Sequence, residues 1–152
     1  EVAEHLPGEA ADTFVNTLTM LGDIILFSAA VPGQGGQNHL NEQWPVYWME
    51  KFIKKGYSFY DEVRWKFWDN NKVEYWYSQN MFLVIKDGTN DFGLKKTEQP
   101  LNVIHPDLFS LAWKSEKHIA SEYRKIVWGE MAPVYYARLL TKSILRRLKL
   151  LR

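Results

Sequence analysis

The chain of 152 residues contains no cysteine, which excludes disulfides and thiolate metal sites and leaves the redox compartment open. No apolar run approaches the roughly 18 to 20 residues that a bilayer-spanning helix needs, and no signal peptide opens the sequence. The formal net charge is only +1, so the chain lacks the basic excess typical of nucleic-acid-binding proteins. These absences favour a cytoplasmic location and argue against nucleic acid as a partner.

The composition is that of a folded domain. Hydrophobic residues make up 46%, aromatic residues 15% and charged residues 24% of the chain, unlike a disordered segment. The length suffices for one hydrophobic core. The residues from Glu1 to Pro7 have the character of a domain interior rather than of a loose terminus, so we expect that further sequence precedes them.

Apolar periodicity predicts a helix followed by a strand in the first part of the chain. Apolar residues recur at helical spacing over 9–21, and Gly22 is expected to end this helix. Residues 23–30 are apolar on both alternating faces, which is typical of a parallel-sheet strand buried between helical layers. A Gly-rich loop over 31–41 follows.

A second helix is expected after this loop, with Asn41 as its N-cap and Gly56 at its end. Trp44, Trp48 and Phe52 recur every four residues along it. Packing of this stripe in the core is favoured about four to one over a surface for stacking ligands.

Two further strands are predicted at 57–68 and 73–86, joined by a turn at 69–72. Strand, helix, strand and tight return together predict a right-handed βαβ unit with an antiparallel last strand added by a hairpin. Three strands leave the strand at 23–30 at an edge of the sheet, a position that proteins usually avoid for such a strand. The sequence therefore behaves like part of a larger sheet.

The domain organisation expected from these patterns is an α/β half-domain over 1–87, a linker loop over 88–105 and a helical extension over 106–152. Helices are predicted at 108–128 and from Pro133 to the end. The last helix carries basic side chains beside an apolar stripe. A stripe packed on the same chain is favoured about two to one over membrane contact or partner binding through this helix.

The loop after the strand at 23–30 is the expected ligand site, because ligands of open α/β sheets bind beyond the carboxyl ends of the strands. We expect Gly35, Gly36 and Asn41 to contact a substrate there, with His39 and Glu42 beside them. On spacing alone, glycines that merely form a turn are favoured about two to one over a binding site.

Several stretches resemble a group of class I S-adenosylmethionine-dependent methyltransferases. They are EVAEHLP at 1–7, FSAAVPGQGGQNHLNEQWPVYW at 27–48, and an R…W…V..WY.QN segment formed by Arg64, Trp68, Val73, Trp76, Tyr77, Gln79 and Asn80. A later HPD turn at 105–107 resembles that group as well. The resemblance covers roughly residues 1–107 and implies the C-terminal half of a Rossmann-like methyltransferase domain.

The resemblance also implies roles for single residues. Glu1 and Val2 would lie at the end of the fourth strand near the methionine part of the cofactor, and His5 would lie close to the methyl-transfer site. His39 would project from the loop after the fifth strand and accept the proton of a substrate hydroxyl. Glu42 would orient that imidazole or the hydroxyl.

The chain departs from a complete enzyme in one respect. Such an enzyme carries a Gly-rich turn after its first strand and an acidic residue at the end of its second, which hold the cofactor, and neither is present. The resemblance therefore implies part of a methyltransferase that acts on a small-molecule acceptor, with O-methylation favoured. We expect this isolated chain to bind S-adenosylmethionine poorly and to be inactive.

Two alternatives to this enzyme hypothesis stay open. The first is a non-catalytic interaction or assembly protein, whose exposed sheet edge pairs with a copy of itself or with a partner chain. The second is a metal site formed by His5, His39 and Glu42, which receives about one chance in ten because its spacing matches no known site. No metal is therefore expected, and His105 and His118 are expected to be surface or capping residues.

Overall fold

The computed structural model describes residues 1–150, which belong to two compact units. The first unit, Glu1–Phe109, contains the whole sheet, and the second begins at Ser110. The described residues have an α/β fold with one three-stranded antiparallel sheet and six α-helices. Within residues 1–150, no helix has both the length and the apolar character that crossing a bilayer requires.

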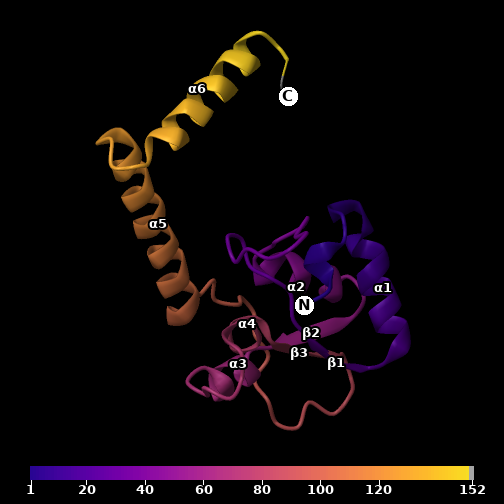
Figure 1. The fold of residues 1–152 in the computed structure, drawn as a ribbon. Helices are drawn as coiled ribbons and strands as arrows, with labels where there is room; N and C mark the ends of the chain where they lie inside the picture. The colour runs from indigo at the N-terminus through magenta and orange to yellow at the C-terminus, as the bar shows by residue number, and fades with distance from the viewer. Residues whose placement is uncertain (151–152) are drawn as a thin grey trace. The chain divides into compact units, whose positions relative to one another are not determined.

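The sheet has the strand order β1-β3-β2 (Figure 1). Its strands are β1 (Ile24–Phe27), β2 (Tyr57–Tyr60) and β3 (Phe82–Lys86). The central strand β3 is antiparallel to both neighbours, so that Leu83 lies opposite Leu26 on one side and opposite Tyr60 on the other. β1 and β2 therefore run in the same direction, with the last strand between them.

The predicted succession of strand, helix and strand is present as β1, α2 (Pro45–Ile53) and β2. The predicted tight hairpin is wrong. The strand expected over 57–68 ends at Tyr60, and the one expected over 73–86 begins only at Phe82. Two short helices, α3 (Glu62–Phe67) and α4 (Tyr75–Asn80), separate β2 from β3.

A buried ion pair explains why the chain turns helical after β2. Arg64 is fully buried and pairs with the carboxylate of Asp61, three residues earlier. Residues three apart lie side by side on a helix but point to opposite faces of a strand. Trp65 and Trp68 obey the same spacing, with ring centroids 5.1 Å apart. The aromatic content of this segment suggested a strand, but its side-chain partners require a helix.

The first helix agrees with its prediction. α1 (Ala11–Leu21) follows a short 3-10 turn at Gly8–Ala10 and stops before Gly22. Gly22 is extended rather than left-handed, with φ of −176°.

α2 begins at Pro45, so the prediction of Asn41 as its N-cap is wrong; the residue at the cap position is Trp44. The segment before Pro45 is bound elsewhere: the Asn41 backbone N–H donates to the Glu4 carbonyl, and the Glu42 carboxylate binds the Gly-rich loop. Hydrogen bonds that hold these residues in the loop keep them out of the helix.

The core of the first unit is aromatic, and the predicted stripe contributes Trp48 and Phe52 to it, whereas Trp44 precedes α2 and is half-buried. Trp48 and Phe52 are buried, with exposed fractions of 1% and 0%. The Phe27 ring of β1 lies 5.4 Å from the Trp48 ring and 5.2 Å from the Phe52 ring. From β2, the Phe59 ring lies 5.7 Å from that of Phe52. Tilted and edge-on ring pairs of this kind add to the stabilisation from burial of apolar area.

The two edges of the sheet differ. β1 is an edge strand, as predicted, but it is not buried on both faces, because Ile24 and Leu26 are 47% and 61% exposed. At the other edge, the Phe59 carbonyl of β2 accepts a hydrogen bond of 2.8 Å from the Thr97 backbone N–H. The segment 88–105, expected to be a linker, thus belongs to the first unit and covers the edge of β2.

The helical extension agrees with its prediction over most of its length. α5 (Pro106–Val127) and α6 (Pro133–Arg147) replace the helices expected at 108–128 and after Pro133. The last helix ends earlier than expected, and the remainder of that prediction at 151–152 lies outside the described residues. The Tyr136 hydroxyl ties the two helices together, 3.1 Å from the Lys125 carbonyl and 3.0 Å from the Ile126 carbonyl. No described residue of α6 is buried.

Candidate functional site

The ends of all three strands bring polar residues to one edge of the sheet. Because β1 and β2 run in the same direction, their carboxyl ends share this edge with the start of β3. Ser28 follows β1, Asp61 follows β2 and Asn80 precedes β3. The Gly-rich loop after β1 lies at the same edge, where ligands of α/β sheets bind.

Glu42 organises the Gly-rich loop. Its two carboxylate oxygens accept hydrogen bonds from the backbone N–H groups of Gly33, at 2.8 Å, and Gly35, at 2.9 Å. Both glycines have positive φ, +82° and +71°, a conformation that glycine adopts without the steric cost of a side chain. The glycines therefore allow the loop to curl around one carboxylate.

The same carboxylate holds His39. The His39 Nδ1 lies 2.8 Å from the Glu42 Oε1, and both side chains are mostly buried, at 12% and 20% exposure. An ionised carboxylate only accepts hydrogen bonds, so Nδ1 carries the hydrogen and Nε2 keeps its lone pair. Burial alone would raise the pKa of Glu42, but the hydrogen bonds from His39, Gly33 and Gly35 hold it below its ordinary value of 4.5.

Gly36 provides the space for the imidazole. A Cβ atom at this position would lie 2.3 Å from the His39 Nε2 and 2.4 Å from its Cε1. The ring therefore rests directly on the backbone of Gly36, which only glycine permits.

A short 3-10 turn, Ala3–His5, packs against this loop. The Glu4 carbonyl accepts hydrogen bonds from the Leu40 and Asn41 backbone N–H groups, at 2.7 and 2.9 Å. The turn thereby places the His5 ring edge-on to the His39 ring, with centroids 4.8 Å apart. The Glu4 carboxyl group is buried beneath them and has no hydrogen-bond partner.

Most of the residues expected at the site surround one cavity of about 340 Å³. It is lined by Glu1, Glu4, His5, Gln34, Gly35, Gly36, His39, Tyr75 and Trp76. Glu42 lies behind His39 rather than in the lining. Val2 lines a separate, mainly apolar cavity of about 280 Å³ beside β1. Asn41 is buried, and its Oδ1 accepts a hydrogen bond from Gln43 instead of facing either cavity.

A network of amides fixes the floor of the cavity. The Gln34 side-chain oxygen accepts hydrogen bonds from Gln79, at 3.1 Å, and from Asn80, at 2.8 Å. Asn80 also donates to the Glu1 Oε1 at 2.9 Å. Gln79 and Asn80 are almost completely buried, so this network holds the loop and Glu1 in fixed positions relative to α4.

Sequence reasoning did not assign Glu4, Gln34, Tyr75 or Trp76 to the site. Glu4 carried a usable signal, because it is an acidic residue directly beside His5 in a segment with domain-interior character. Tyr75 and Trp76 were placed on a predicted strand, and only their position at the start of α4 brings them to the cavity.

The Arg64 guanidinium supports the network from behind. It donates to the Gln79 carbonyl at 3.4 Å and to the Leu101 carbonyl at 2.8 Å, in addition to its ion pair with Asp61. Burial raises the pKa of Asp61, and the hydrogen bond and charge of Arg64 oppose that shift. The side chain thus joins α3, α4 and the segment that follows β3.

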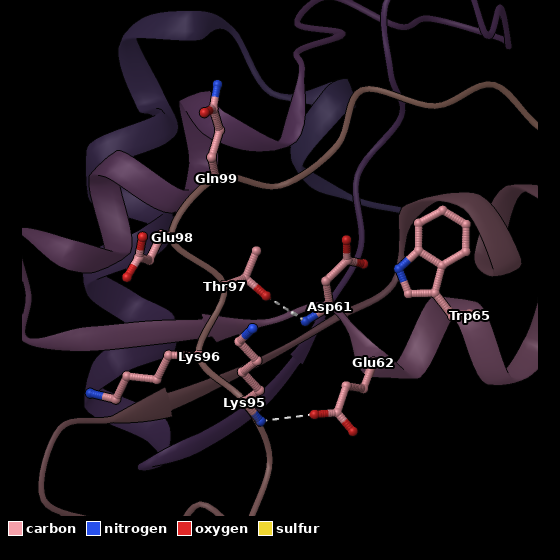
Figure 2. A pocket seen from close by; sticks show the side chains of 8 residues that line it. All are labelled: Asp61, Glu62, Trp65, Lys95, Lys96, Thr97, Glu98 and Gln99. Carbon is pink, nitrogen blue, oxygen red and sulfur yellow. Dashed lines mark hydrogen bonds between the residues drawn. The ribbon is translucent and has the colours of Figure 1, made fainter.

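A further depression, of about 530 Å³, lies on the covered side of β2 (Figure 2). Two hydrogen bonds close its walls: the Thr97 hydroxyl accepts from the Asp61 backbone N–H at 2.9 Å, and Glu62 accepts from the Lys95 backbone N–H at 2.8 Å. The Asp61 carboxylate at its margin is bound to Arg64. These contacts attach the segment after β3 to the sheet, and the depression follows from that attachment.

His105 caps the start of α5 and is buried, at 9% exposure, rather than on the surface. Its Nδ1 accepts from the Asp107 backbone N–H at 3.2 Å, so its Nε2 donates to the Trp68 carbonyl at 2.8 Å. Both ring nitrogens are used, whereas His118 is exposed on α5.

Comparison of the chain with protein-family models, with curated proteins and with solved structures finds no match. Support for a function therefore comes from the geometry of the cavity around His39 and from the resemblance of the sequence motifs.

Proposed function

We propose that this chain is part of an S-adenosylmethionine-dependent methyltransferase that methylates a hydroxyl group of a small-molecule acceptor. The observation that carries the proposal is the His39–Glu42 pair, in which the His39 Nδ1 lies 2.8 Å from the carboxylate and the ring lines a cavity shared with Glu1 and His5. The succession β1, α2, β2 with an antiparallel last strand also agrees with the half-domain that the motifs imply.

The chemistry required of these residues is modest. Bound S-adenosylmethionine would supply the methyl group to the acceptor oxygen, and its sulfur would take the electron pair of the broken carbon–sulfur bond. The hydroxyl proton passes to the His39 Nε2, whose lone pair is free because Nδ1 carries the hydrogen bonded to Glu42. Alignment of oxygen, methyl carbon and sulfur contributes most to such a reaction, and the rigid loop around Glu42 supplies a fixed position for the base.

S-adenosylmethionine is the implied cofactor, and its methionine end would lie beside Glu1 and His5. The described residues contain no Gly-rich turn between a first strand and its helix, so the purine, ribose and most of the amino acid have no cradle here. We therefore expect the chain to contribute the methyl-transfer side of a site whose cofactor side comes from other residues.

Calorimetric titration with S-adenosylhomocysteine tests this division. The 152-residue chain should show no binding at millimolar ligand, whereas its complex with a partner segment that carries a Gly-rich cofactor turn should bind at micromolar concentration. With labelled S-adenosylmethionine and a panel of sugars and phenols, His39→Gln should then lower turnover by about 10² to 10⁴-fold and leave S-adenosylhomocysteine binding unchanged. His118→Gln is the matched control. Failure of such a complex to bind S-adenosylhomocysteine would refute the proposal.

A second candidate is a non-catalytic assembly protein, which the exposed edge of β1 favours. Ile24 and Leu26 belong to a strand that, within the described residues, pairs with β3 along one edge only, and Met20 and Leu21 at the end of α1 are 78% and 79% exposed. Exposed apolar edge strands are templates for pairing with another chain. Light scattering distinguishes the candidates: a stable homodimer that binds no S-adenosylhomocysteine would favour assembly.

A further inference from the structure

We infer that Glu4, His5 and His39 form a binding site for a divalent transition-metal ion. Each residue offers one ligand atom, and these atoms all lie within 4.8 Å of one another. The Glu4 carboxyl group is 1% exposed, and neither of its oxygens has a hydrogen-bond partner. A buried carboxylate without a partner is costly, and a bound cation would remove that cost.

The charge of the cavity favours a cation as the ligand. Glu1 and Glu4 both line it, and its lining contains no lysine or arginine. Two carboxyl groups beside two imidazoles, with no basic side chain to neutralise them, match the oxygen and nitrogen ligands that divalent metals take in proteins.

The surroundings of His39 resemble those of a metal ligand. Metal-binding imidazoles usually donate the hydrogen of their other ring nitrogen to a carboxylate or carbonyl, which fixes the tautomer and the ring orientation. The His39 Nδ1 does so with Glu42, at 2.8 Å, and Nε2 is left for a metal. Glu42 was the carboxylate ligand considered from sequence, but its oxygens are engaged by His39 and the loop glycines.

Two histidines and one glutamate are a donor set typical of catalytic zinc, which keeps a further position open. The His5 Nε2 lies 4.0 Å from the Glu4 Oε1, whereas tetrahedral ligands about 2.1 Å from an ion lie roughly 3.4 Å apart. A movement of about 0.6 Å closes this difference, and one of about 1.4 Å closes a separation of 4.8 Å, the upper limit for these three atoms. The His5 side chain, which is 43% exposed, is the least buried of the three ligands.

The purpose of the ion depends on the proposed function, although its binding does not. A coordinated Nε2 has no lone pair for a proton, so in the metal-bound protein His39 holds the ion. An ion held there would lower the pKa of an acceptor hydroxyl as it does that of bound water, and the proton would pass to solvent. His39 would thus be a ligand in the metal-bound protein and would remain the proton acceptor of the proposed reaction in the metal-free protein.

Titration of the metal-free chain with Co²⁺, followed by visible absorbance, and with Zn²⁺, followed by calorimetry, tests the inference. We expect one ion per chain at micromolar concentration, with absorption bands of a nitrogen- and oxygen-ligated cobalt. Glu4→Gln and His5→Gln should each weaken binding by more than about 100-fold, and Glu42→Gln by about 10 to 100-fold through the orientation of His39. His118→Gln should leave binding unchanged.

Circular dichroism of each variant shows whether it is folded. If Glu4→Gln does not fold, His5→Gln still tests the site, because it changes a partly exposed side chain. No binding at millimolar metal, or binding that both variants retain, would overturn the inference. Metal binding by the chain, together with no binding of S-adenosylhomocysteine by its complex with a segment that carries a cofactor turn, would keep the metal site and refute the methyltransferase. Binding of S-adenosylhomocysteine without binding of metal would refute the metal site alone.

Discussion

Replacement of Gly36 by alanine should dislodge the His39 ring and destabilise the loop. The new Cβ would lie 2.3 Å from the His39 Nε2, closer than any stable contact, and φ at this position is +154°. A backbone conformation that only glycine adopts readily costs another residue about 1 to 3 kcal/mol. Loss of the hydrogen bond from His39 to the ionised Glu42 adds about 1.5 kcal/mol. This is the lower end of the range for hydrogen bonds to charged groups, because both side chains are slightly exposed.

The sum, roughly 3 kcal/mol, should lower the Tm of a domain of this size by about 6 to 12 °C. Thermal unfolding followed by circular dichroism measures this, and Gly35→Ala is the matched control. Gly35 has φ of +71°, and a Cβ atom added there would meet no atom within 4 Å, so its replacement should cost only about 1 to 2 kcal/mol of backbone strain. Nitrogen-detected NMR of the imidazole should show that Nδ1 loses its hydrogen-bonded proton in Gly36→Ala and keeps it in Gly35→Ala.

A double-mutant cycle isolates the contact between the two residues. In a His39→Ala background, the clash is absent, so Gly36→Ala should cost only its backbone strain. The coupling energy should therefore be about 1 to 3 kcal/mol. Additive effects, with coupling below about 0.5 kcal/mol, would show that the ring does not rest on Gly36 and would refute the geometry of the site.

Three further outcomes are expected. In metal-free buffer, Glu4→Gln should raise stability at pH 7 by about 1 to 2 kcal/mol. The pKa of Glu4 is raised in the folded protein, so protonated Glu4 stabilises the fold fully below its ordinary pKa of 4.5. This stabilisation is lost as the pH rises through the pKa of Glu4 in the folded protein. Urea unfolding should therefore show a higher free energy of unfolding for Glu4→Gln at pH 7 but not at pH 4. Arg64→Met should lower the free energy of unfolding by about 3 to 5 kcal/mol, because it leaves Asp61 buried and unpaired. The control Arg138→Met, at an exposed position, should lower it by less than about 0.5 kcal/mol. Similar losses in the two variants would contradict the buried ion pair. Leu26→Lys should weaken any self-association seen by light scattering without a change in Tm above about 2 °C, and an unchanged dimer would show that β1 is not the contact.

Local patterns were sufficient for the elements whose partners are near in sequence. The helix ending before Gly22, the stripe of Trp48 and Phe52 and the long helix α5 all follow from apolar spacing within a single segment. The edge position of β1 followed from a count of strands. For the helices and the stripe, the decisive contacts repeat at the period of the element, so the sequence displays them directly.

The segment between β2 and β3 could not be predicted in this way. Its aromatic and β-branched residues favour a strand, and its helical state depends on Arg64, whose partners include the Leu101 carbonyl. A guanidinium that joins three separate segments exerts its effect only after the chain has folded. The last strand likewise lies between β1 and β2 because of pairing across the sheet, which no local period reports.

The candidate site divides in a similar manner. His39 and Glu42 are three residues apart in one loop, so their hydrogen bond could be anticipated from sequence. Which carboxylate is free to bind a metal could not be anticipated, because the sequence does not distinguish Glu4 from Glu42. Packing of the Ala3–His5 turn under the loop buries Glu4, whereas the N–H groups of Gly33 and Gly35 engage Glu42.

The two candidate functions share one residue and are therefore linked. Glu1 lines both the polar cavity around His39 and the apolar cavity beside β1. A strand added along the free edge of β1 would cover Ile25 and Leu26, which line the apolar cavity, and would bring its own carboxyl or amino end close to Glu1. Completion of the sheet would then also complete a wall of the polar cavity. An assembly partner at this edge is accordingly the element that would supply the cofactor side of the proposed methyltransferase site.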